Sequence, residues 1–133
     1  MNFNNKNIRP IKGDASFRKF YRKKNKHKTS IVVYANKQKE KNLLIYDAIN
    51  KLLLKNKIFA PKLYSYNYKN NYIEVEDLGK KTLFDFLKKK KVNRLKHFKK
   101  IIKILINIQK INKKKIKNFR SNYYKIPVYK RDI

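Results

Sequence analysis

The sequence predicts an α+β fold, in which a small antiparallel sheet carries one packed helix and is followed by further helices. Two patterns predict it. Short alternating or β-branched runs fill the first 79 residues and are interrupted by one helical pattern. After residue 80, apolar residues recur at helical spacing. The 133 residues are 41% apolar and include 18 Phe and Tyr, which is enough for one core.

The first strands are predicted from aromatic alternation and from a β-branched run. Residues 9–12 can begin a strand, and Gly13-Asp14 is typical of a turn. Residues 16–22 alternate, so that Phe17, Lys19 and Tyr21 point to one side of the sheet and Arg18, Phe20 and Arg22 to the other. A polar turn at 23–28 leads to the run SIVVYA at 30–35, which is typical of a buried strand.

A change of period at residues 37–56 predicts an amphipathic helix of about five turns. Its apolar face is formed by Leu44, Ile45, Ala48, Ile49, Leu52 and Leu53, which we expect to be mostly buried. Pro61 prevents the helix from continuing beyond Ala60. Residues 62–68 and 72–76 then predict a hairpin around 69–71, where asparagine tolerates left-handed backbone.

The rest of the chain is predicted to be helical. Thr82-x-x-Asp85 resembles a capping box, and Asn93 can cap a longer helix. One face of that helix carries Leu95, Phe98, Ile101, Ile102, Leu105 and Ile108. Helical periodicity fades from residue 113 and predicts an extended tail. We therefore divide the chain into a sheet-containing part at 1–79, helices at 80–112 and a linker or tail at 113–133.

Composition excludes several classes of protein. The sequence has no cysteine, so disulfides, cysteine zinc sites and thiol catalysis are excluded. No run of 18 apolar residues is present, so we expect no membrane span, and the N-terminus has no apolar signal region. The formal charge of +30 attracts polyanions without selectivity. Because Lys and Asn dominate, an A/T-rich genome explains part of this charge.

Two short strings point to a ligand site. The segment 13–18 is a glycine-led turn between two predicted strands; its backbone N–H groups and the Ser16 hydroxyl can approach an anion, although an ordinary hairpin turn is the alternative. The segment 73–79 contains three of the eight acids, with Glu74 and Glu76 on one strand face and Val75 on the other. A strand that ends in Glu-Asp-Leu-Gly before a capped helix has the layout of a hinge, although acids facing nearby lysines are the alternative.

Taken in order, GDASFRKFYR, SIVVYA, Ala60-Pro61, EDLG and the tail string YKRD resemble the bacterial aminoglycoside-phosphotransferase-like family. The similar branch contains the anomeric kinases of N-acetylmuramate and N-acetylglucosamine, and the resemblance spans about residues 8–133. It implies a protein-kinase-like N-terminal lobe, ATP with Mg²⁺, transfer to an amino-sugar hydroxyl and a cytoplasmic location. It also implies a phosphate-covering loop of Gly13, Asp14, Ala15, Ser16, Phe17 and Arg18. The implied adenine-holding hinge is Glu76, Asp77 and Leu78.

The chain departs from that pattern in two ways. The strand at 30–35 lacks the lysine that kinases place on their third strand, which leaves Arg18 and Lys37 as phosphate-binding candidates and Glu40 and Asp47 as possible helix partners. The His-Gly-Asp and Asn loop of the family and its later metal-binding Asp are absent, and Arg131-Asp132 has no preceding His. We therefore expect no catalytic residue and no Mg²⁺ ligand in this chain, which would be inactive alone.

Two other functions compete with a truncated kinase-like lobe. A basic nucleic-acid-binding module is supported by the charge and the aromatic content, but the aromatics lie at core spacings and no known binding motif is present. A gene remnant without a selected function is the third hypothesis. His27 and His97 lack a second ligand at metal spacing and indicate surface residues.

Overall fold

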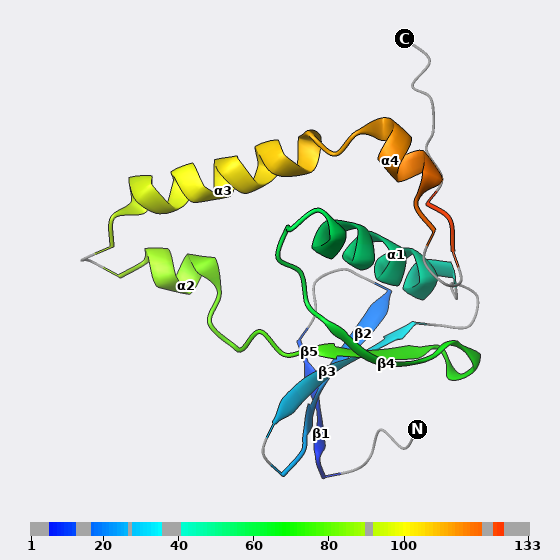
Figure 1. The fold of residues 1–133 in the computed structure, drawn as a ribbon. Helices are drawn as coiled ribbons and strands as arrows, with labels where there is room; N and C mark the ends of the chain where they lie inside the picture. Colours follow the sequence, from blue (N-terminus) through cyan, green and yellow to red (C-terminus); the bar gives the residue numbers. More distant parts are fainter. Residues whose placement is uncertain are drawn as a thin grey trace.

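The computed structural model describes residues 6–12, 17–26, 28–35, 41–89, 92–120 and 124–126. Its centre is a five-stranded antiparallel sheet with strand order β1-β2-β3-β5-β4 (Figure 1). The strands are β1 (Ile8–Ile11), β2 (Arg18–Lys24), β3 (Thr29–Ala35), β4 (Leu63–Asn67) and β5 (Tyr72–Glu76). The predicted α+β class and the predicted strands are therefore confirmed in general terms.

Side-chain alternation gives the sheet two chemically different faces. Cross-strand partners lie on the same face, and the register pairs Arg18 with Ala35 and Phe20 with Val33. These residues share their face with Val75, so the predicted alternation is confirmed for residues 18–22, which lie in β2. We call this the core face, because the cluster of buried apolar residues forms on it. The opposite face carries Lys23, Ser30 and Glu74.

Helix α1 (Lys41–Lys55) covers the β3–β5 part of the core face (Figure 1). The cluster between them consists of Val33, Ala35, Leu43, Ile73 and Val75. The helix presents Leu43, Asp47, Ala48 and Leu52 as buried residues, whereas Ile49 is 43% exposed. Of the predicted face, Ala48 and Leu52 are buried, whereas Leu44, Ile45 and Leu53 are only partly buried, and the prediction was wrong at Ile49. Leu43, which precedes the predicted set, is buried in the core.

Left-handed backbone at two non-glycine residues shapes the connections around β4 and β5. Asn71 has a φ of 58° after the short 3-10 helix η2 (Tyr68–Asn70), which confirms the predicted asparagine turn. Lys57 has a φ of 59° just after α1, and Ile58 N–H donates to the Leu53 carbonyl at 2.9 Å. The helix thus ends several residues before Pro61, and the Asn50 amide then holds the Pro61 carbonyl.

The C-terminal helices are α2 (Leu83–Leu87), α3 (Arg94–Gln109) and α4 (Lys113–Asn118). Thr82 and Asp85 form the predicted capping box, and Asn93 caps α3 by accepting from Lys96 N–H at 3.0 Å. Helix α4 contradicts the predicted tail. The sequence signal for this helix was its N-terminal cap, Asn112. Ile111 and Ile116 belong to a second apolar cluster, which also contains Leu52 of α1 and Ile58 just after it.

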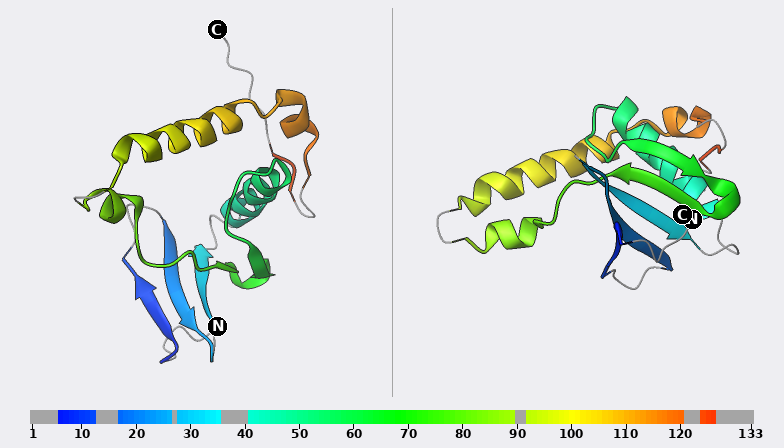
Figure 2. Two further views of the ribbon diagram at one scale, coloured as in Figure 1. Left: turned by 60° about the vertical axis from the view of Figure 1, so that its left-hand side comes forward. Right: turned by 90° about the horizontal axis from the view of Figure 1, so that it is seen from below.

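Helix α3 runs from α2 to α4, while α4 lies beside α1 (Figure 2). None of its residues is buried. The exposed large apolar side chains here are Leu95, Phe98, Ile102, Ile104, Leu105, Ile106 and Ile108, and α2 adds Leu83, Phe84 and Phe86. We call this set the α2–α3 apolar surface. Within the described part of the chain, no helix is long and apolar enough to cross a membrane.

Candidate functional site

The candidate site lies on the core face, at the two ends of strand β2. Of the predicted phosphate-covering loop, Gly13, Asp14, Ala15 and Ser16 lie outside the described residues, and Phe17 and Arg18 are described. The Arg18 guanidinium lies 5.6 Å from the ring centroid of Tyr46 on α1 and 5.5 Å from that of Phe17. Burial raises the pKa of Tyr46, and the nearby Arg18 charge opposes that rise. The cation at the start of β2 is thus placed where the sheet meets α1.

A bidentate ion pair marks the other end. Arg22 Nε and Nη2 donate to Asp77 Oδ2 and Oδ1 at 2.6 and 3.0 Å, and Nη2 also donates to the Gly79 carbonyl at 3.1 Å. Gly79 N–H donates back to Asp77 at 2.9 Å. Gly79 has a φ of 95°, a left-handed conformation that a glycine adopts without strain. We call these three residues the exit clamp, because they hold the chain where it leaves β5.

The exit clamp keeps Asp77 ionised. The Arg22 guanidinium, aided by Thr29 and Gly79, lowers the pKa of Asp77 from 3.8 to about 2 against the opposing effect of burial. Its side chain is only 4% exposed, whereas that of Arg22 is 21% exposed. The carboxylate of the predicted hinge residue is therefore engaged within the protein, and Asp77 positions the exit segment.

The two arginines at the ends of β2 point to the same side of the sheet. Arg18 and Arg22 lie on the same face of β2, four residues apart, which corresponds to about 13 Å along a strand. Between them, Phe20 pairs with Ile11 on one side and Val33 on the other, which makes an apolar strip.

An open cavity of about 570 Å³ adjoins the clamp end of this strip. Among the residues that the structure describes, the lining includes no acid and five cations: Lys6, Arg9, Arg22, Lys24 and Lys80. Arg9 and Arg22 are cross-strand partners, so both side chains lie on the core face. Asp77 neutralises Arg22, so the positive charge of the cavity comes from Lys6, Arg9, Lys24 and Lys80, and its size is that of a small-ligand pocket.

Of the other two predicted hinge residues, Glu76 makes a contact within the protein and Leu78 is exposed. Glu76 Oε2 accepts from Lys62 N–H at 3.1 Å and so holds the start of the β4 segment, while Leu78 is exposed. Glu74 lies on the opposite face, where it accepts from Ser30 at 2.6 Å and Lys23 at 2.9 Å. Burial raises the pKa of Glu74, but these hydrogen bonds outweigh it and place the pKa below its ordinary value.

The structure places one of the two helix acids. Asp47 is buried and accepts from Lys51 Nζ at 2.8 Å within α1, while its Oδ1 atom has no hydrogen-bond partner in the described part of the chain. It is thus paired along its own helix. Lys37 and Glu40, the remaining candidates, lie outside the described residues. Ala35, whose strand partner is Arg18, occupies the core face where a strand lysine would point.

Mg²⁺ ligands are not found among the residues that the structure describes, since no group of three His, Cys, Asp or Glu side chains lies close enough to hold a metal ion there. Arg131 and Asp132 lie outside those residues. The described site therefore consists of cations and an apolar strip.

No protein-family model, curated protein or solved structure matches this chain. The functional argument consequently depends on the geometry and on the short strings of the sequence.

Sequence reasoning missed the parts that join the site together. Arg22 and Tyr46 were not site candidates, although Arg22 was placed on the same face as Arg18. The alternation of side chains along the strand was the sequence signal that placed Arg22 on this face. The pairing of Arg22 with Asp77 joins residues 55 positions apart and has no local signature.

Proposed function

We propose that this chain is the nucleotide-binding portion of an ATP-dependent phosphotransferase with a kinase-like fold, acting on an amino-sugar hydroxyl. The observation that carries the proposal is the topology. One helix follows the third strand and covers the sheet, and the chain leaves the interior strand β5 through a clamped segment into helices. This is the layout that the family resemblance implies for a nucleotide-binding lobe. The amino-sugar acceptor is taken from the resemblance alone.

The orientation of ATP in this proposal follows the family resemblance, which places adenine at the exit segment, whereas the cation-lined cavity beside the exit clamp favours the opposite orientation. The adenine ring would lie near the exit segment against the strip of Ile11 and Phe20, because this is the apolar part of the open core face. The phosphates would then reach the Arg18 end of β2. Arg18 would act as the fixed positive charge that kinases obtain from a strand lysine.

The α2–α3 apolar surface supports a second helical layer. Soluble proteins seldom expose so many large apolar side chains on neighbouring helices, and such a surface is typical of an interface. In the proposed enzyme, this surface packs against the helices that carry the catalytic Asp, the Asn and the metal-binding Asp. Those groups would position the sugar and the metal, which contribute most of the catalysis in phosphoryl transfer.

ATP binding tests the orientation of the nucleotide. Half a cleft leaves the phosphates in water, so we expect a dissociation constant of about 1 mM for ATP by isothermal titration calorimetry. Replacement of Arg18 by Gln should weaken ATP binding about fivefold and leave adenosine binding unchanged, because a partly exposed charge contact contributes about 1 kcal/mol. Lys99→Gln, which removes the same charge from α3, is the matched control. Equal losses in both variants would show general attraction to the basic chain.

Phosphoryl transfer is tested separately. In a coupled ADP-release assay with N-acetylmuramate or N-acetylglucosamine, we expect no sugar-dependent turnover by the chain alone at saturating ATP and Mg²⁺. The reason is that neither Arg18 nor the exit clamp can orient a sugar hydroxyl or hold a metal ion. Sugar-dependent turnover that Asp132→Asn abolishes would contradict the proposal.

A further inference from the structure

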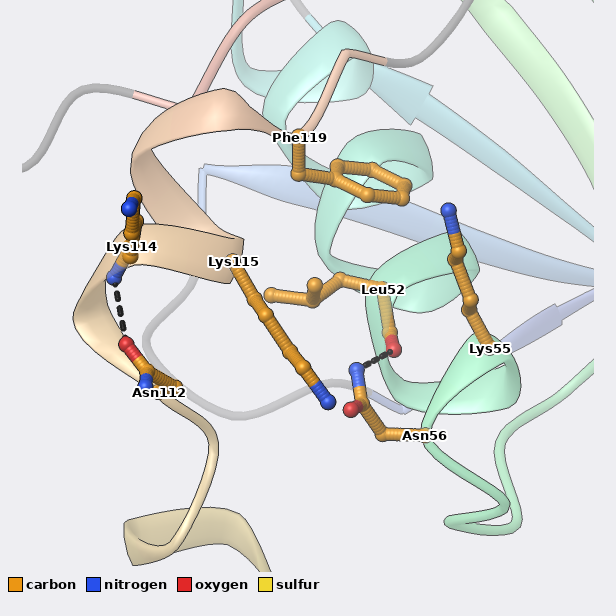
Figure 3. A pocket seen from close by; sticks show the side chains of 7 residues that line it. All are labelled: Leu52, Lys55, Asn56, Asn112, Lys114, Lys115 and Phe119. Carbon is orange, nitrogen blue, oxygen red and sulfur yellow. Dashed lines mark hydrogen bonds between the residues drawn. The ribbon is translucent and has the colours of Figure 1, made fainter.

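A second cavity, of about 520 Å³, lies far from the exit clamp, between the C-terminal half of α1 and helix α4. It is lined by Leu52, Lys55, Asn56, Asn112, Lys114, Lys115 and Phe119. Figure 3 shows Leu52 at its centre, with Lys55 on the α1 side and Lys115 reaching in from α4. We call this the α1–α4 pocket. Its two walls are joined by the cluster of Leu52, Ile58 and Ile111 beneath it.

The floor of the pocket is apolar and its polar groups are positive or already bonded. Phe119 and Leu52 supply the apolar surface, and the Lys55 ammonium lies 5.9 Å from the Phe119 ring centroid. The Asn56 amide donates to the Leu52 carbonyl at 2.8 Å, and Asn112 accepts from Lys114 N–H at 2.8 Å. One atom of each amide holds a helix end, and the lysines supply the charge that the pocket presents to a ligand.

Charge decides the class of ligand. Three lysines line the pocket and no acidic residue does, at least among the residues that the structure describes. The sequence has no acidic residue between Asp85 and Asp132, so local neutralisation by the α3–α4 segment is not possible. Ammonium groups above an aromatic and aliphatic floor are complementary to an anion that carries an apolar ring. A highly charged phosphate would gain nothing from Leu52 and Phe119.

The geometry points to the α1–α4 pocket as a binding site for a small aromatic carboxylate. The ring packs on Phe119 above Leu52, and the carboxylate pairs with Lys55 of α1 or with Lys115 of α4, whose ammonium groups lie on different sides of Leu52 (Figure 3). This site is separate from the proposed nucleotide site and does not depend on it. A bound ligand connects α1 with the α4 segment, since α1 contributes Leu52 and Lys55, α4 contributes Lys114 and Lys115, and Phe119 follows α4 directly.

The test is an NMR titration of the full chain with 2-naphthoate, followed by amide shifts of Asn56 and Phe119. We expect saturable shifts at these residues and binding about fivefold weaker in Lys55→Gln/Lys115→Gln, because two partly solvated charge contacts together contribute about 1 kcal/mol. The Lys55→Arg/Lys115→Arg variant should retain binding. The uncharged 2-naphthamide, with the same ring, should bind as weakly to the wild-type chain as naphthoate does to the Gln variant.

Lys99→Gln/Lys100→Gln is the control for net charge, because it removes two positive charges from α3. It should change the affinity for 2-naphthoate less than twofold, since these charges lie outside the pocket. Equal weakening by both double variants, saturable shifts centred on α3, or an absence of binding would each overturn the assignment. Thermal unfolding of every variant shows whether a loss of binding reflects a loss of fold.

Discussion

Replacement of Leu43 by alanine is expected to lower the free energy of unfolding by about 3 kcal/mol, the usual loss for a large apolar side chain removed from a packed core. Leu43 is fully buried, and it packs with Val33, Ala35 and Ile73 between α1 and the sheet. The cavity cannot collapse easily, because the backbones of β3 and β5 are held in their ladder. Urea unfolding followed by circular dichroism measures the change.

Ile49→Ala on the same helix is the matched control. Ile49 is 43% exposed, so we expect a loss of at most about 1 kcal/mol. Both substitutions place alanine, a strong helix former, within α1, so the difference between them reports packing rather than helix propensity. A larger loss at Ile49 than at Leu43 would mean that α1 uses the face predicted from the sequence and that the orientation described above is wrong.

Asp77→Asn is expected to lower the free energy of unfolding at pH 7 by about 1.5 kcal/mol, because it removes a bidentate charged contact that solvent partly screens. The wild-type advantage should depend on pH. The folded-state pKa of Asp77 is about 2, below the value of 3.8 for the free group. A lowered carboxyl pKa stabilises the fold above pH 4, and this stabilisation is lost as the pH falls towards 2.

The measurement is the difference in unfolding free energy between the wild-type protein and Asp77→Asn at pH 7, 4 and 2. Other acids with lowered pKa values, such as Glu74, contribute to both proteins and cancel in the difference. Arg22→Gln should reproduce the loss at pH 7, since Arg22 is the main cause of the shift. A difference that stays constant down to pH 2 would contradict the assignment of Asp77 as an ion-paired carboxylate.

Local patterns in the sequence were sufficient to predict most of the secondary structure. The capping box at Thr82 and Asp85, the cap at Asn93 and the left-handed Asn71 are confirmed because each depends on residues within three positions. The two faces of β2 followed from alternation alone, since side chains along a strand point to opposite sides. The α4 helix was missed because its lysines and single described apolar residue, Ile116, give too weak a periodic signal.

The candidate site was predictable only in part. The sequence indicated Arg18 and the segment Glu76–Leu78, and the structure shows that Glu76 and Asp77 use their carboxylates for internal contacts. It also placed Asp47 among the possible partners of a phosphate-binding cation, whereas Asp47 pairs with Lys51. Helical periodicity indicates approximately which way a side chain points around the helix axis. Periodicity does not identify the residue of another strand or helix that contacts this side chain.

The sequence by itself determined the five strands, the helices other than α4, the caps at which α2 and α3 begin, and the strong positive charge of the chain. Only the tertiary structure decided that Leu43 and not Ile49 enters the core, that Arg22 holds Asp77, and that the apolar face of α3 stays exposed. The physical reason is distance along the chain. Caps and alternation depend on neighbouring residues, whereas burial and ion pairing depend on segments that only the packing of the sheet against α1 brings together.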